Sequence, residues 1–152
     1  MGTMENWETL LRSAHTIAVL GASSRPDRPA FFVPDYLYRT GYRILPVNPA
    51  QVGQRLWGEP VVGSLGELHQ DIDVLDVFRR SEVLFEHLDD ILQAKPKLVW
   101  LQSGIRNDAF AARLEAAGIA VVQDRCLMVE HRRRLGQSSQ ARGLGQSSSG
   151  TE

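Results

Sequence analysis

Five short apolar runs recur along the chain, each bounded by turn-forming residues. They cover residues 17–20, 42–47, 74–78, 98–101 and 119–122. Their apolarity is continuous rather than alternating, which is typical of strands covered on both faces in a parallel sheet. The pattern therefore predicts a five-stranded, mainly parallel sheet with helices on both faces.

Apolar side chains recur at helical spacing between these runs. Residues 29–40 form one such stretch, and Gly41 can adopt the left-handed conformation that ends a helix. Ser81 and Asn107 are candidate N-caps for two further helices, and an amphipathic helix around Trp7 precedes the first strand. The repeated strand–helix–strand order predicts a three-layer, Rossmann-like α/β fold.

A single domain over residues 1–135 is the expected organisation. The 152 residues are 43% hydrophobic and 23% charged, an ordinary composition for one globular core. Residues 49–72 are rich in Gly and Pro and replace a full crossover helix. Residues 136–152 contain little apolar side-chain area, so we expect a disordered tail.

Ligands of open α/β sheets bind beyond the carboxyl ends of the strands, where the strand order reverses. We expect the order 3-2-1-4-5, in which the reversal lies between the first and fourth strands. The loops at residues 21–29 and 102–107 would then face each other across a crevice. This crevice is the predicted ligand site.

Overall charge favours no large polyanionic partner. The formal net charge is −1, from 17 basic and 18 acidic residues, so we expect neither a nucleic acid nor a membrane as partner. The single cysteine, Cys126, excludes an internal disulfide and suits a reducing compartment. No signal peptide or membrane-spanning run is apparent, which predicts a cytoplasmic protein. The scattered histidines and carboxylates give no metal-ligand cluster, so no metal site is expected.

The loop after the first strand has the chemistry of an anion-binding turn. A glycine allows a ligand to approach the backbone, serine hydroxyls add donors at a helix start, and arginines can bind phosphate through two hydrogen bonds. A plain turn with solvated arginines would show the same residue types, so both interpretations remain open from turn chemistry alone. The candidate residues are Gly21, Ala22, Ser23, Ser24, Arg25, Arg28 and Pro29.

A nicotinamide cofactor has less support. The loop lacks the Gly-x-Gly-x-x-Gly pattern, and Asn48 stands near the position where a dinucleotide-binding domain places an acid for the ribose. An NAD(P)-binding, oxidoreductase-like protein is therefore the third-ranked interpretation.

Five sequence blocks in a fixed order carry a family resemblance. They are residues 21–29, 46–49, 76–80, 99–107 and 124–131. Together they resemble the small stand-alone CoA-binding proteins, a family similar to the CoA-binding domain of the succinyl-CoA synthetase α subunit. The resemblance spans about residues 10–135. It implies a Rossmann-like sheet whose first loop receives the phosphates of coenzyme A.

The resemblance also implies roles for individual positions. The first loop would hold the pyrophosphate, with its two arginines as charged partners, and the segments after strands two, three and four would complete the site. A turn, a core position or a solvated charge is the structural alternative for each residue outside the first loop. The further positions are Asn48 and Pro49 beside the adenosine, Val77, Phe78 and Arg79 on the other side of the nucleotide, and Gln102, Ser103 and Gly104 beside the pantetheine.

The leading functional hypothesis is a module that binds coenzyme A or an acyl-CoA and catalyses no reaction alone, so no catalytic residue is assigned. The alternative is a component of an acid–CoA ligase, because the related synthetase domain belongs to such an enzyme. Cys126 is a weaker candidate nucleophile, since a lone cysteine after a buried strand is usually a packed side chain. A homodimer is compatible with the exposed edges of such a sheet.

Overall fold

The predicted strands form one parallel sheet in a computed structural model, which describes residues 2–136. Every residue of the last three strands is buried, which accounts for their uninterrupted apolar runs. The predicted fold class is confirmed, whereas the expected tail at residues 136–152 lies, except for Gly136, outside the described residues. The strands are β1 (Thr16–Leu20), β2 (Arg43–Val47), β5 (Val74–Val77), β6 (Leu98–Leu101) and β7 (Ala120–Val122).

The strand order differs from the predicted 3-2-1-4-5. The observed order is β2-β1-β5-β6-β7, so the third main strand lies in the centre of the sheet and not at its edge. The outer edge of β2 is already occupied, because Val62 bridges Val47 and its amide donates to the carbonyl of Pro46. The chain therefore passes β1 before it re-enters the sheet. As a result, the order reverses between β1 and β5.

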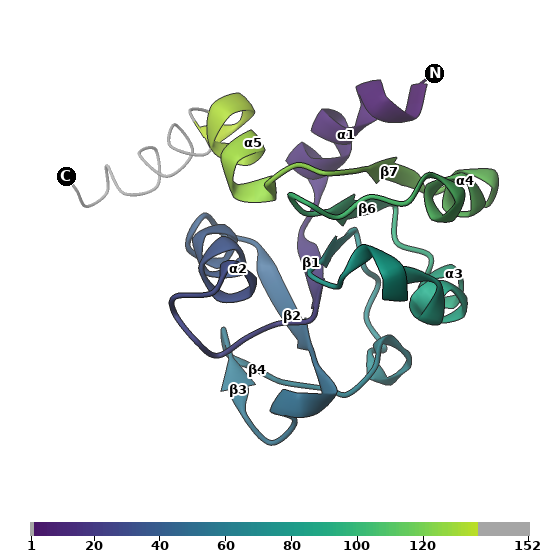
Figure 1. Ribbon diagram of the computed structural model, residues 1–152. Helices are drawn as coiled ribbons and strands as arrows, with labels where there is room; N and C mark the ends of the chain where they lie inside the picture. Colours follow the sequence, from purple (N-terminus) through teal and green to yellow (C-terminus); the bar gives the residue numbers. More distant parts are fainter. Residues whose placement is uncertain (1, 137–152) are drawn as a thin grey trace.

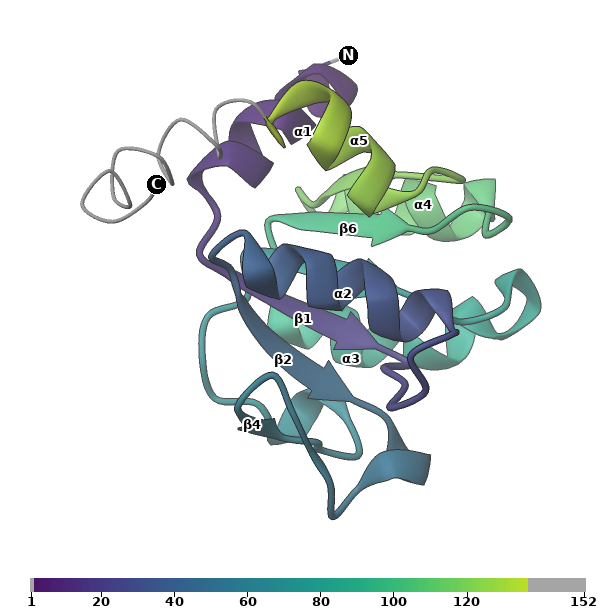
Figure 2. The same ribbon diagram turned by 90° about the vertical axis from the view of Figure 1, so that its left-hand side faces the viewer.

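Helices cover both faces of this sheet (Figures 1 and 2). One face carries α1 (Gly2–Ser13), α2 (Pro29–Arg39) and α5 (Leu127–Arg134), and its core includes Ile17 and Val19 of β1. The other face carries α3 (Leu88–Ala94) and α4 (Asp108–Ala116), and its core includes Ala18 and Leu20. The alternation of β1 side chains between two apolar layers makes the domain a three-layer sandwich.

The segment between β2 and β5 contains no full crossover helix, as the sequence predicts. It holds short 3-10 turns at Pro49–Gln51 and Leu65–Glu67 and an antiparallel hairpin of β3 (Arg55–Leu56) and β4 (Glu59–Pro60). The hairpin tip packs on α2, where the Trp57 indole lies 5.6 Å from the Phe31 ring. These contacts cover the first turns of α2.

One local prediction needs correction, and one helix was missed. The helix expected to start with Ser81 as N-cap is a 3-10 segment, Ser81–His87, followed by α3, and the Ser81 hydroxyl accepts the backbone N–H of Arg106 instead. Helix α5 was not predicted, because its three consecutive arginines resemble a solvated chain end. The Asn107 cap is confirmed, since its side chain accepts the N–H of Phe110.

Within residues 2–136, no helix combines the length and the apolar character needed to cross a membrane.

Candidate functional site

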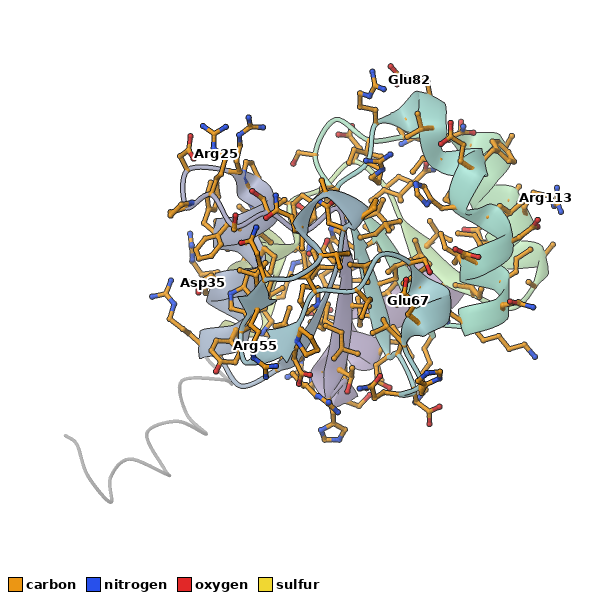
Figure 3. All side chains as sticks on the ribbon, turned by 90° about the horizontal axis from the view of Figure 1, so that it is seen from below. Arg25, Asp35, Arg55, Glu67, Glu82 and Arg113 are labelled. Atoms are coloured by element: carbon orange, nitrogen blue, oxygen red, sulfur yellow. The ribbon has the colours of Figure 1, made fainter. Side chains whose placement is uncertain are left out.

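A cleft of about 720 Å³ opens at the carboxyl ends of β1, β5 and β6. Its walls come from the loop after β1, the start of α2, the segment after β5 and the loop after β6. Figure 3 shows Arg25 and Glu82, which line opposite walls, at the same end of the molecule. The cleft therefore lies at the reversal of the strand order, where ligands of such sheets bind.

The structure brings most of the predicted site residues to this cleft. Gly21, Ser23, Arg25, Arg28, Pro29, Asn48, Phe78, Arg79, Gln102, Ser103 and Gly104 all line it. Four predicted residues do not: Ser24 and Pro49 are absent from the lining, and the side chains of Ala22 and Val77 are fully buried in the core. The predicted loops at 21–29 and 102–107 thus share one cleft, and the segment after β5 joins them.

Gly21 is the point where the ends of three strands meet. Its N–H donates to the carbonyl of Val47 at 2.8 Å, and its φ of 92° lies in the left-handed region. A Cβ at this position would lie 2.7 Å from the carbonyl oxygen of Phe78. The absence of a side chain therefore allows the loop after β1 to approach the end of β5 closely.

Asn48 connects the first loop with the segment after β2. Its Nδ2 donates to the carbonyl of Ala22 at 2.8 Å, and its Oδ1 accepts the N–H of Ala50 at 2.9 Å. The position requires both a donor and an acceptor, which an amide supplies and a carboxylate does not.

Replacing Asn48 by aspartate is expected to lower the free energy of unfolding by about 1–3 kcal/mol. The carboxylate would face the Ala22 carbonyl, so two acceptors would meet where one hydrogen bond now lies. Urea unfolding of the variant measures the loss. Gln54→Glu is the charge-matched control, because Gln54 is exposed and its side chain bonds, among the described residues, only to Gln51. Equal stability of the two variants would contradict the assigned role of Asn48.

Positive charge predominates on the walls of the cleft. Arg25 pairs with Asp27 at 3.7 Å and Arg80 with Glu82 at 4.0 Å, both at exposed positions where such pairs contribute little. In the part of the chain that the structure describes, no carboxylate lies within 4.0 Å of the guanidinium of Arg28 or Arg79. These two arginines are available to an anionic ligand.

A hydrogen bond to His87 holds the Arg79 side chain in place. This side chain is half-buried, and its Nε donates to Nε2 of His87 at 3.3 Å. Burial, together with the charge of Arg79, lowers the pKa of His87, which keeps the ring neutral and able to accept this hydrogen bond. The Arg79 side chain also lies beside Gly21, where a Cβ would be 3.4 Å from its Cδ. Arg79 is therefore fixed next to the first loop.

Helix α2 begins at the same wall. Its N-terminus carries no side-chain cap and no acidic residue in the first turn, and Pro29 stands at its start. The partial positive charge of this helix end adds to the charge of Arg28, its N-cap residue. The arrangement favours a negatively charged group at this end of the cleft.

The loop after β6 is ordered by side chains that sequence reasoning missed. The Gly104 N–H donates to Oδ1 of Asp124 at 2.7 Å, and the Arg106 N–H donates to the Ser81 hydroxyl at 2.9 Å. Asp124 itself has a positive φ of 59°. No local pattern predicts these contacts, because the residues are separated by 20 or more positions in the sequence.

A buried carboxyl group lies behind the cleft. Asp76 in β5 is fully buried, and its Oδ1 accepts a hydrogen bond from Nε2 of Gln102, a residue that lines the cleft. Burial raises the pKa of Asp76 to about 8, although the bond from Gln102 acts in the opposite direction. The Asp76 side chain is therefore a neutral acid at pH 7. Its sequence signal was a lone acidic residue inside an apolar run.

The remaining candidates lie as follows. Cys126 lines the cleft as a half-buried free thiol just before α5. His131 is fully buried, and its Nδ1 lies 2.8 Å from the Tyr36 hydroxyl. Among the side chains that the structure describes, residues 7–136, no group of three or more histidine, cysteine or acidic residues could hold a metal ion.

Comparison with known proteins identifies the family. The sequence profile described as "CoA binding domain" matches residues 15–132. YneT of Bacillus subtilis (strain 168) is 37% identical over 122 residues, which cover 80% of this chain and 89% of YneT.

Two solved structures show the same architecture. Cell-free ID.343 from Thermus thermophilus is 52% identical, with a TM-score of 0.84 over 89% of this chain and 100% of that chain. A hypothetical protein from Pyrococcus horikoshii OT3 is 32% identical, with a TM-score of 0.78 over 90% of this chain and 94% of that chain. The match to the profile covers most of the fold and every wall of the cleft, and the chain belongs to the CoA-binding domain family.

Proposed function

We propose that this protein binds coenzyme A, or an acyl-CoA, in the cleft at the end of β1, β5 and β6. The observation that carries the proposal is the cluster of cationic groups around the first loop. Arg28, Arg79 and the N-terminus of α2 converge there without a neutralising carboxylate in the described chain. The phosphates of the ligand occupy this end of the cleft, and the pantetheine extends toward Gln102 and Gly104.

Recognition of a phosphorylated ligand follows from the chemistry of these groups. Guanidinium groups bind phosphate oxygens through charge-assisted hydrogen bonds, and the amides of a helix N-terminus favour the same anion. The family assignment supports coenzyme A as the phosphorylated ligand. Asn48 supports coenzyme A over NAD. Its position holds an amide that bonds to the backbone, where a dinucleotide-binding domain places a carboxylate for the ribose.

Removing the two cleft arginines that have no carboxylate partner among the described residues tests this proposal. The double variant Arg28→Ala, Arg79→Ala is expected to weaken CoA binding about 100-fold, since each charge-assisted hydrogen bond contributes about 1.5 kcal/mol or more. Arg113→Ala is the matched control, because Arg113 is an exposed arginine of α4 that does not line the cleft (Figure 3). Calorimetric titration with CoA measures the dissociation constants.

Salt dependence gives a second readout from the same titrations. The unchanged protein and Arg113→Ala should lose affinity as ionic strength rises, whereas the double variant should respond less, because two charged contacts are gone. Equal CoA affinities for the double variant and the Arg113→Ala control would contradict the proposed binding mode.

A further inference from the structure

The buried carboxyl of Asp76 has no role in the proposed phosphate site, although it lies next to the cleft. It occupies the central strand, between Val19 of β1 and Trp100 of β6. Its Oδ2 is buried and has no hydrogen-bond partner among the described residues. Neither Val19 nor Trp100 requires a carboxyl group beside it. An apolar side chain in this buried parallel strand would avoid the cost of burying a polar group. A polar group kept at such a place needs another explanation.

Within the described chain, Gln102 is the only side chain that forms a hydrogen bond with Asp76, and this bond supplies an explanation. Oδ1 of Asp76 accepts from Nε2 of Gln102, and Oε1 of Gln102 accepts the N–H of Leu127 at 3.4 Å. The carboxamide is thereby held at both ends, with its nitrogen toward Asp76 and its oxygen toward the start of α5. The opposite orientation would place the Gln102 nitrogen against the Leu127 N–H, so two donors would meet there.

A carboxamide nitrogen carries two hydrogens, and Asp76 accepts only one of them. The second N–H of Gln102 has no acceptor in the described part of the chain, and Gln102 lines the cleft. A buried donor of this kind requires a partner, and a ligand in the cleft can supply it.

We propose that Asp76 is a positioning residue that fixes the Gln102 carboxamide so that its second N–H donates to a carbonyl oxygen of the bound ligand. The inference rests on the proposed function and adds the group that is recognised. The pantetheine arm of CoA carries two amide carbonyls, and an acyl-CoA adds that of the thioester. The adenosine diphosphate part has none. Asp76 therefore affects the binding of the pantetheine end of the ligand and not that of the adenosine diphosphate end.

Two ligands and two substitutions separate this role from a purely structural one. Asp76→Val removes the acceptor and keeps a strand-compatible apolar side chain, whereas Asp76→Asn keeps an oxygen that can accept from Gln102. We expect Asp76→Val to weaken CoA binding about tenfold, the effect of one hydrogen bond, and to change ADP binding less than twofold. Asp76→Asn should recover most of the CoA affinity.

Gln102→Met provides an independent variant, because it removes the donor with little change in volume. It should weaken CoA binding by the same factor and change ADP binding as little as Asp76→Val does. Unchanged CoA affinity in Asp76→Val and Gln102→Met, or equal losses for CoA and ADP, would overturn the inference while the proposed function stands. Failure of the unchanged protein to bind CoA would overturn both.

Discussion

The Asp76→Asn variant should be more stable than the unchanged protein at pH 7, and its stability should depend less on pH. The folded state holds a proton on Asp76 up to about pH 8, whereas the unfolded chain releases it above about pH 3.8. The unfolded state is therefore increasingly favoured as the pH rises from 3.8 to 8. Above pH 8 both states are ionised, and the contribution of this group no longer changes.

The size of the effect follows from the same pKa difference. At pH 7 the neutral, buried Asp76 costs about 4 kcal/mol, at 1.36 kcal/mol for each pH unit above 3.8. Asparagine avoids this cost. Its amide nitrogen would take the place of Oδ2, which has no partner, and burying this unpaired N–H would cost about 1–3 kcal/mol. A net gain of about 1–3 kcal/mol remains.

Urea unfolding at several pH values from 4.5 to 8.5 measures both quantities. Glu115→Gln is the control, because Glu115 is an exposed acid of α4 whose removal changes the net charge by the same amount. A stability profile for Asp76→Asn that stays parallel to the profile of the control would show that Asp76 does not carry this proton.

Alanine at position 21 is expected to lower the free energy of unfolding by about 3–5 kcal/mol and to abolish CoA binding. The left-handed backbone costs an L-residue about 1–2 kcal/mol. The added Cβ would lie 2.7 Å from the carbonyl oxygen of Phe78, a backbone atom that can move only if the ends of β1 and β5 separate. That separation would also displace the first loop from Arg79.

Gly118→Ala separates the steric effect from the backbone effect. Gly118 has a similar φ of 86°, but no atom lies within 4 Å of its would-be Cβ. The control should therefore lose only about 1–2 kcal/mol and keep its CoA affinity. Thermal unfolding and calorimetry compare the two variants, and equal losses would mean that the approach of Gly21 to Phe78 is unimportant.

The fold class could be predicted from the sequence because strands that are buried on both faces are continuously apolar. The run at residues 98–101 is wholly apolar, and all four of its residues are buried between two layers. Strand order leaves no such pattern, because the apolar runs resemble one another. In the folded chain Val62 lies against the outer edge of β2, a position that depends on how an irregular segment folds back.

The candidate site was predictable where the chemistry is local. Gly21 and the arginines of the first loop lie within eight consecutive residues, and all of them line one cleft. The support behind the site depends on distant partners. Asp124 and Ser81 hold the loop after β6 through contacts that only the folded chain creates. The lone acid in the run at residues 74–78 was the one sequence signal for the buried carboxyl.

The ¹H–¹⁵N correlation spectrum of the full chain during a titration with CoA tests the central claim most directly. We expect saturable shifts of the amides at Gly21, Ser23, Ser81 and Gly104, which surround the cleft. Amides around the separate pocket at residues 92–97 and 117–119 should not move. The absence of saturable shifts, or shifts confined to that second pocket, would contradict the assignment of the cleft as the CoA site.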